Sequence, residues 1–258
     1  MLCGFDDELP PVHSYGPLCT LFYDADKPAA PDAEVDWYAR HLPPDAGPLL
    51  ELMCGSGRLL VPLAARGLKL HGVDASAAML ASCEARLAAR ELVAPLFRQD
   101  LTQLNLPFRY AAAFVAMGSF QLITDPGAAL SALRRIRAHL VDPGLLLLDM
   151  FVPSESAQRL GAPLVEVRTV RLADDTTIAL RSESTVWAEA RMSRTDYRYA
   201  HRRGAARLAE EHETLTLTWY APDDIVAMLT ESGFSDATVL ESKRDDAGEL
   251  TFSVSARA

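Results

Sequence analysis

The spacing of apolar and polar positions changes along the chain and separates strand-like from helix-like segments. Short apolar runs predict buried strands, and they occur at 48–50, 69–73, 94–98, 112–117 and 145–149. Between these runs, apolar residues recur at helical spacing, at 59–64, 76–90 and 125–140. Strands that alternate with helices in this way predict an α/β fold with a doubly wound, mostly parallel sheet.

Two further segments break the alternation. Before the first strand, apolar and aromatic residues predict helices over 15–24 and 32–42, the second of which Asp32 could cap. After the fifth strand, residues 153–220 show no recurring helical period. Their Thr, Val and aromatic residues alternate with charges, which predicts an antiparallel sheet with one solvated face.

The chain therefore divides into three parts, of which the core is interrupted once. Residues 1–46 are predicted to form an N-terminal helical part after a loose lead-in over 1–13. Residues 47–152 and 221–258 form the core, and residues 153–220 form the antiparallel insertion within it. The second core segment is predicted to contain a helix followed by two short strands, with a charged turn between them.

The stretch between the first two strands carries the clearest chemical signal. Gly55 and Gly57 follow the first strand, where they allow a sharp turn and a close approach of the backbone to a ligand. Asp74 ends the second strand, 23 residues after Glu51, near the spacing at which an acid reaches ribose hydroxyls. Leu60 stands where a third glycine would fit a pyrophosphate, so the loop favours a nucleoside without phosphates.

These residues resemble the class I S-adenosylmethionine-dependent methyltransferases. The resemblance rests on Glu51-x-x-Cys54-Gly55-x-Gly57, Asp74, the stretch 97–101 and the strand 145–149. It covers residues 47–152 and, more loosely, 221–258. Residues 153–220 look like the small antiparallel sheet of the glycine and sugar-amine N-methyltransferases. The resemblance implies a seven-stranded Rossmann-like sheet, with the insertion after strand 5 and an N-terminal helical lid over the cofactor.

The resemblance also implies S-adenosylmethionine as cofactor and S-adenosylhomocysteine as product. In the family's pattern, Asp74 accepts the ribose hydroxyls, Asp100 binds the adenine amine beside the Leu101 backbone, and Glu51 faces the methionine amino group. The complete set expected to bind the cofactor is Tyr23, Glu51, Cys54, Gly55, Ser56, Gly57, Asp74, Ala75, Met79, Asp100, Leu101, Met117 and Gly118.

The expected reaction is transfer of the methyl group to a nitrogen or oxygen of a small molecule by in-line displacement. Positioning can supply much of the rate, so no catalytic triad is required. Residues expected near the acceptor are Tyr15, Ser119, Gln121, Phe151, Tyr197 and Trp219. A general base is left unassigned, and the candidates are Tyr23, Tyr197, His201, Glu211 and His212, each of which could equally be an ordinary surface residue.

The composition of the chain limits which kinds of partner, metal and cellular location we expect. The 258 residues are 49% hydrophobic and carry a net charge of −10, which suits one sizeable core and disfavours nucleic acid as substrate. No apolar run reaches membrane-spanning length and no export signal is evident, so we expect a cytoplasmic protein. The four cysteines, Cys3, Cys19, Cys54 and Cys83, lack metal-binding spacing, so no metal is expected.

Other interpretations stay open at this point. A non-catalytic module or sensor that only binds S-adenosylmethionine would carry the same loop. An NAD-dependent dehydrogenase is disfavoured by Glu51 and by the missing third glycine. A homodimer is compatible with the resemblance. The identity of the methyl acceptor cannot be derived from the residues.

Overall fold

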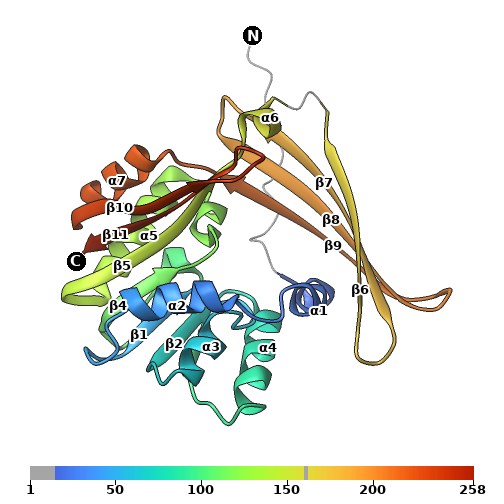
Figure 1. Ribbon diagram of the computed structural model, residues 1–258, viewed down its shortest axis with the longest axis horizontal. Helices are drawn as coiled ribbons and strands as arrows, with labels where there is room; N and C mark the ends of the chain where they lie inside the picture. The colour runs from blue at the N-terminus through green and yellow to red at the C-terminus, as the bar shows by residue number, and fades with distance from the viewer. Residues whose placement is uncertain (1–14, 160–161) are drawn as a thin grey trace.

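The computed structural model describes residues 15–159 and 162–258, which form two β-sheets and the helices that flank them (Figure 1). The lead-in expected over 1–13, together with Cys3, lies outside these residues. The α-helices are α1 (Pro17–Asp26), α2 (Asp32–His41), α3 (Leu60–Ala65), α4 (Ala77–Ala88), α5 (Pro126–Ala138), α6 (Glu155–Gln158) and α7 (Pro222–Glu231). Two short 3-10 helices are η1 (Leu101–Gln103) and η2 (Ser119–Leu122).

The larger sheet has seven strands in the order β10-β11-β5-β4-β1-β2-β3. Its strands are β1 (Leu49–Leu52), β2 (Leu70–Asp74), β3 (Leu96–Arg98), β4 (Tyr110–Val115), β5 (Leu140–Val152), β10 (Ser235–Arg244) and β11 (Leu250–Arg257). Strands β1 to β5 run parallel, and β11 pairs antiparallel with both β5 and β10. The doubly wound, mostly parallel seven-stranded sheet predicted from the sequence is therefore confirmed.

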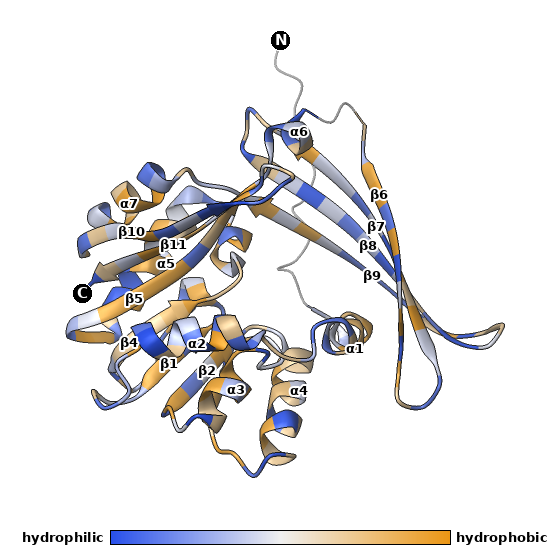
Figure 2. Ribbon diagram, viewed as in Figure 1, coloured by the Kyte–Doolittle hydropathy of each residue, from blue (hydrophilic) through white to orange (hydrophobic). Residues whose placement is uncertain are grey.

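Both faces of this sheet are buried, which explains the continuous apolar runs of its strands. Within β4, Ala113 and Val115 pack in the core beneath α5 and α7, whereas Ala112 and Phe114 pack beneath α2, α3 and α4. Figure 2 shows the apolar colouring of β1, β4 and β5 between the helices. The resulting three layers leave the carboxyl ends of the parallel strands as the edge where a site can form.

The smaller sheet joins β6 (Leu164–Arg171), β7 (Thr177–Trp187), β8 (Met192–Arg203) and β9 (Ala206–Thr218) in sequential antiparallel order. One patch of it, formed by Ile178, Leu180 and Tyr199, packs against Leu18 and Phe22 of α1. Most other positions of its strands are partly or fully exposed. The expected antiparallel insertion with a solvated face is confirmed.

Helix α1 is anchored by this smaller sheet in a way that its own sequence does not show. Gly16 offers no capping side chain, and the N–H groups of Leu18 and Cys19 instead donate to the Glu211 carboxylate, at 3.0 and 2.9 Å. Glu213 accepts from the Gly16 N–H. Two carboxylates of β9 thus satisfy the free N–H groups at the start of α1 and complement its dipole.

Several predicted boundaries were wrong by a few residues. The first helix begins at Pro17 rather than at 15, and Asp32 does not cap α2, because Pro31 holds the N-cap position. Strand β4 ends at Val115 rather than at 117, since the next loop takes left-handed backbone angles at Met117 and Gly118. The strands of the last hairpin are longer than the expected 237–240 and 250–254: β10 spans Ser235–Arg244, and β11 begins at Leu250 as expected but continues to Arg257.

Candidate functional site

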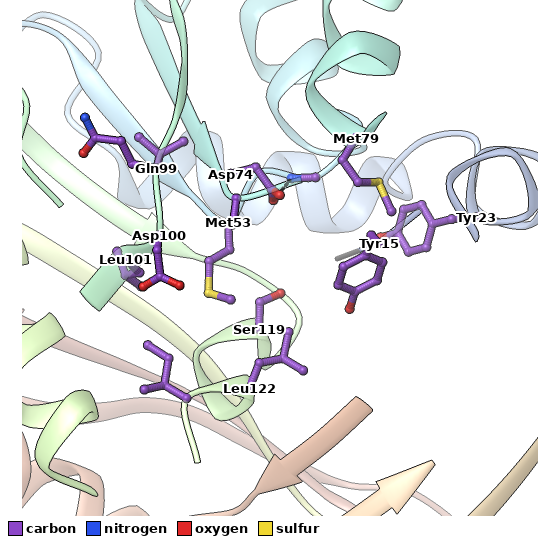
Figure 3. Close-up of a pocket in the computed structure, with 14 residues that line it drawn as sticks. Tyr15, Tyr23, Met53, Asp74, Met79, Gln99, Asp100, Leu101, Ser119 and Leu122 are labelled. Atoms are coloured by element: carbon purple, nitrogen blue, oxygen red, sulfur yellow. Dashed lines mark hydrogen bonds between the residues drawn. The ribbon is translucent and has the colours of Figure 1, made fainter. Parts of the chain in front are cut away.

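A pocket opens at the carboxyl ends of β1, β2 and β3, close to α1 (Figure 3). It holds about 860 Å³ of empty space, including the part open to solvent. Its walls combine the loops after these strands with η2, Tyr15 before α1 and Tyr23 near the end of α1. The lining residues are Tyr15, Tyr23, Met53, Gly55, Val73, Asp74, Ala75, Met79, Gln99, Asp100, Leu101, Ser119, Leu122 and Ile123.

The loop after β1 brings bare backbone to the pocket wall at Gly55. Gly55 has a φ of 54°, and a Cβ built there would meet only Met79 Sδ, at 3.9 Å. A side chain would therefore enter the open pocket and would also be strained by the left-handed backbone. Met53, two residues earlier, adopts a φ of 55° and lines the same pocket. This part of the loop is shaped for close approach of a ligand.

Asp74, at the end of β2, fixes this loop. Its Oδ2 accepts the Gly55 N–H at 2.8 Å and its Oδ1 accepts the Ser76 N–H at 2.8 Å. Burial raises the pKa of Asp74, while the backbone donors of Ser76, Gly55 and Ala75 oppose that shift. Each carboxylate oxygen keeps acceptor capacity for a further donor, so Asp74 can bind hydroxyl groups in the pocket.

Asp100 and Leu101 stand at the opposite end of the pocket, after β3. Asp100 Oδ1 accepts the Thr102 N–H at 2.7 Å and thereby caps η1. The carboxylate is held in one orientation at the pocket wall, beside the buried Leu101. Gln99 also lines the pocket, but its amide is bound to the backbone of Asn105 and turns toward the outer edge in Figure 3.

A group of charged and aromatic side chains lies beside the loop, near Tyr23. Arg58 donates to both carboxylate oxygens of Glu34. Burial raises the pKa of Tyr23, and the nearby charge of Arg58 opposes the shift. Glu51 is only 3% exposed, and its Oε2 has no hydrogen-bond partner among the described residues. Burial raises the pKa of Glu51 well above its usual range, although Arg58 opposes the shift. A cationic donor placed here would satisfy the free oxygen of Glu51.

Two contacts hold α1 against the core, and they bring its aromatic residues to the pocket. The Ser76 hydroxyl donates to the Tyr15 carbonyl at 2.6 Å, just before α1 begins. Asp24 of α1 accepts from Ser82 and pairs with Arg86 of α4 at 3.3 Å. The rings of Tyr15 and Tyr23 consequently lie on one side of the pocket, with Met79 above them in Figure 3.

Four residues expected to contact the cofactor do not line the pocket: Glu51, which is described above, and Cys54, Ser56 and Gly57. Ser56 is fully buried, and Arg86 donates to its carbonyl and its hydroxyl at 3.1 Å each. A Cβ at Gly57 would come within 2.6 Å of Cys83 Sγ, so this glycine is required by packing of the loop on α4. Cys54 is buried in the same core cluster. Cys54, Ser56 and Gly57 shape the loop and do not line the pocket, and their contact with the cofactor stays a prediction.

Gln121 and Trp219, expected near the acceptor, are also buried away from the pocket lining. The Gln121 amide donates to the carbonyls of Phe151 and Thr218, at 2.9 and 3.0 Å, and accepts the Phe151 N–H at 2.8 Å. These hydrogen bonds of Gln121 join η2 to β5 and β9. Trp219 is 4% exposed. Both residues support the fold around the site, contrary to the expectation.

The candidate bases of the smaller sheet do not line the pocket either. Tyr197 stacks on its neighbour Tyr199, with ring centroids 6.2 Å apart. His201 is hydrogen-bonded to Thr176 at 2.7 Å, and His212 is exposed beside a glutamate. Glu211 is occupied at the start of α1. Of the five candidates, the structure brings only Tyr23 to the pocket.

Three other expected residues face a second cavity. Met117, Gly118 and Phe151 line a space between α2, the end of β5 and the β10–β11 hairpin, with about 1680 Å³ that includes the part open to solvent. Ser119 lines the first pocket. The segment 117–119 therefore stands between the two cavities, and the expected residues divide between them.

Five pocket residues were missed by the sequence analysis. They are Met53, Val73, Gln99, Leu122 and Ile123. Each lies within two residues of a position that the sequence analysis did identify, and this proximity along the chain was the one signal that could have found it. Their apolar or uncharged side chains carried no chemical signal of their own, because they resemble ordinary strand and helix residues.

Some features are absent from the described residues. Within 15–159 and 162–258, no three His, Cys, Asp or Glu side chains gather in a way that could hold a metal ion. No helix in that part of the chain is long and apolar enough to cross a membrane. Cys19, Cys54 and Cys83 are buried free thiols.

Comparison with known proteins gives a family match and several structural neighbours. The profile of a methyltransferase domain matches residues 49–144. The cypemycin N-terminal methyltransferase of Streptomyces sp. is 30% identical over 121 residues, which cover 47% of this chain and 49% of that protein. The chain thus aligns with about half the length of this curated relative.

Two solved structures extend the likeness to nearly the whole chain. The sugar N-methyltransferase KedS8 from Streptoalloteichus sp. ATCC 53650 has a TM-score of 0.70 and 22% identity, with 98% of each chain covered. The methyltransferase CcbJ from Streptomyces caelestis has a TM-score of 0.69 and 23% identity, covering 95% of this chain and 99% of that one. Residues 49–144 therefore resemble a methyltransferase domain, and the described chain shares its fold with these two solved methyltransferases.

Proposed function

We propose that this protein transfers the methyl group of S-adenosylmethionine to a nitrogen or oxygen atom of a small molecule. The observation that carries the proposal is the pocket at the end of β1 and β2, within the segment matched by the methyltransferase profile. The names of the relatives favour nitrogen, since they include a sugar N-methyltransferase and an N-terminal methyltransferase.

The residues around the pocket fit this cofactor. Asp74 is a carboxylate that accepts two backbone donors and can accept ribose hydroxyls as well. Glu51 offers a buried oxygen without a partner, which suits the ammonium group of the methionine portion. A Cβ at Gly55 would enter the space that the ligand must fill. Asp100 and Leu101 provide a carboxylate and backbone groups for the adenine.

The bound cofactor supplies a methyl group on a positively charged sulfur, which is a good electrophile. This chain supplies position and surroundings. Asp74 and Asp100 fix the two ends of the nucleoside, and the pocket wall of Tyr15, Tyr23 and Met79 limits access of water. Fixing donor and acceptor in line can contribute roughly 7–11 kcal/mol to lowering the barrier. No general base is assigned among the candidates of the smaller sheet.

The finer features of the proposal follow from the same reasoning. We infer that residues 1–46 act as a lid and residues 153–220 as a cap near the acceptor, on the core of 47–152 and 221–258. The net charge of −10 supports a small-molecule acceptor in place of a nucleic acid. A cytoplasmic location and a homodimer remain predictions, which fractionation and light scattering would test.

The proposal is tested in two steps. Isothermal titration calorimetry with S-adenosylhomocysteine should give a single site, and NAD should not bind. Incubation with S-adenosylmethionine and a panel of amines and alcohols should then release S-adenosylhomocysteine for at least one acceptor. Binding of S-adenosylhomocysteine without its release from S-adenosylmethionine in the presence of amine-rich panels would favour a sensor. Absence of S-adenosylhomocysteine binding would refute the proposal.

A further inference from the structure

The second cavity lies on the other side of the segment 117–119 from the proposed cofactor pocket. Helix α2 contributes Trp37 and Tyr38 to its lining, and the end of β5 contributes Asp149 and Phe151. Trp37 Nε1 is buried and has no hydrogen-bond partner among the described residues. The cavity therefore joins aromatic surface with a carboxylate, in a space of about 1680 Å³ that includes its open mouth.

The charge of the lining is predominantly negative. Its acidic residues are Glu34, Asp149, Glu241 and Glu249, and its basic residue is Lys243. Glu34 is paired with Arg58 outside the lining, so Asp149, Glu241 and Glu249 carry the excess negative charge. Carboxylates that share a concave wall focus a negative potential and attract cations. An anionic ligand would meet repulsion from most of these groups, so the chemistry of the cavity favours a positively charged molecule.

Asp149 is built into this wall with a fixed orientation. The Tyr38 hydroxyl donates to Asp149 Oδ2 at 2.5 Å, and the Ser253 hydroxyl donates to Oδ1 at 2.7 Å. Burial raises the pKa of Asp149, while both hydroxyl donors oppose the shift. The residue is half-buried and lines the cavity, and each oxygen can accept one more donor. An ammonium group is such a donor, and aromatic faces nearby also favour cations.

The partition between the two spaces is thin. Met117 and Gly118 line the second cavity, whereas the next residue, Ser119, lines the first. The Tyr23 hydroxyl, from the first pocket, contacts Met117 Sδ at 3.8 Å. Gly118 has a φ of 67°, and a Cβ there would lie 2.7 Å from a ring carbon of Phe151. A larger residue would clash with Phe151 and Gln121, so the close packing of this partition requires glycine at 118.

We propose that the second cavity binds the methyl acceptor, that this acceptor is a primary or secondary amine in its ammonium form, and that Asp149 is its counter-charge. Trp37 and Phe151 then surround the carbon body of the amine. This inference rests on the proposed function, because only a methyl donor in the first pocket makes the adjacency useful. It narrows the acceptor from nitrogen or oxygen to an amine. Before transfer, the bound ammonium gives up one proton, to Asp149 or to solvent at the open mouth of the cavity. The freed nitrogen lone pair then forms the bond to the methyl carbon while the sulfur–carbon bond breaks onto sulfur, which leaves S-adenosylhomocysteine.

Binding is measured with cyclohexylamine as the probe and cyclohexanol as its uncharged analogue, on protein saturated with S-adenosylhomocysteine. The indole ¹H–¹⁵N NMR resonance of Trp37, assigned by its loss in Trp37→Phe, reports the cavity. We expect a saturable shift with the amine and at least a tenfold weaker response to the alcohol. Asp149→Asn should weaken amine binding about tenfold or more. Asp36→Asn, on α2 near the cavity but outside its lining, should leave amine binding unchanged.

A second variant guards against a fold defect in Asp149→Asn. Ala33 is an exposed residue of α2 at the edge of the cavity, and Ala33→Trp should block the amine by filling space. Arg40→Trp, on an exposed part of the same helix, is its matched control. Equal binding of amine and alcohol, amine affinity unaffected by both Asp149→Asn and Ala33→Trp, or no saturable shift would overturn the inference.

The result is separable from the test of the proposed function. If calorimetry shows that S-adenosylhomocysteine binds but the amine does not shift the indole resonance of Trp37, only the assignment of the second cavity fails. If S-adenosylhomocysteine itself does not bind, the proposed function fails first. Binding of the amine with loss in both variants supports the acceptor assignment whatever the turnover of this probe.

Discussion

Replacing Asp74 by alanine tests the proposed nucleoside site most directly. In the free protein, its two oxygens hold the N–H groups of Gly55 and Ser76, both at 2.8 Å. Asp74→Ala removes the two acceptors proposed for the ribose hydroxyls, and it also releases the loop that bears Gly55. Both effects weaken ligand binding, because one removes contacts and the other removes their pre-organisation.

The magnitude follows from the hydrogen bonds involved. A hydrogen bond to a charged group contributes about 1.5–3 kcal/mol, so losing two ribose contacts costs about 3–6 kcal/mol. At about 1.4 kcal/mol per factor of ten, the dissociation constant should rise about 10²- to 10⁴-fold. Asp74→Asn keeps one acceptor oxygen but turns an NH₂ group toward a backbone donor, so we expect roughly half of this loss.

Calorimetry with S-adenosylhomocysteine at pH 8 measures the effect, and circular dichroism checks that each variant is folded. Asp36→Ala provides a control, because Asp36 is an acid on the surface of α2 that pairs with Arg66 and is not part of either lining. A folded Asp74→Ala protein that binds S-adenosylhomocysteine within threefold of the wild type would refute the assignment of this carboxylate.

Three further outcomes are expected. Gly55→Val should lower S-adenosylhomocysteine affinity at least tenfold in calorimetry, since its side chain enters the pocket; unchanged affinity in a folded variant contradicts the close approach. Glu51→Gln should raise the thermal stability at pH 8, and the gain should shrink toward pH 4. Burial raises the pKa of Glu51, so the stability that its protonated carboxyl gives the wild type is lost as the pH rises through that pKa. Glu211→Gln should cost about 1–2 kcal/mol in denaturant unfolding by weakening the cap of α1; an unchanged midpoint argues against it.

The core of the fold could be predicted from the sequence because its signals are local. A strand such as β4, buried on both faces, must be apolar throughout, and a helix such as α5 must repeat apolar residues at 3.6. The Ser76 cap of α4 is also local, since its hydroxyl accepts the Met79 N–H at 3.1 Å. Asp74 and Gly55 could be identified for the same reason, as end residues of adjacent elements.

The remaining site residues depend on partners that are distant in the sequence. Gln121 looked like a contact for a ligand because it follows a strand, but its amide binds Thr218, 97 residues away. Gly57 looked equivalent to Gly55, and the packing of Cys83 and Val61 against Gly57 distinguishes the two. Polar residue type and spacing predict where a site can form. Tertiary contacts decide whether a given side chain lines the pocket or is buried in the surrounding structure.

The anchoring of α1 changes what the smaller sheet is expected to do. Because the sequence places Tyr197 and Trp219 of the insertion near the acceptor, it leads us to expect that deleting 174–200 harms turnover more than cofactor binding. In the structure, that segment supplies Tyr199, whose hydroxyl donates to Cys19 at 3.2 Å and whose ring packs edge-on against Phe22, with centroids 5.8 Å apart.

Helix α1 in turn carries Tyr23 to the first pocket, so the smaller sheet acts on that pocket through α1. Tyr199→Ala should therefore weaken S-adenosylhomocysteine binding in calorimetry although Tyr199 is absent from the pocket lining, because a loosened α1 must be ordered again when the ligand binds. Leu208→Ala, at an exposed position of β9 outside the contact with α1, serves as control. If Tyr199→Ala binds S-adenosylhomocysteine as tightly as the control does, the pocket is formed by the core alone and the original expectation for the insertion stands.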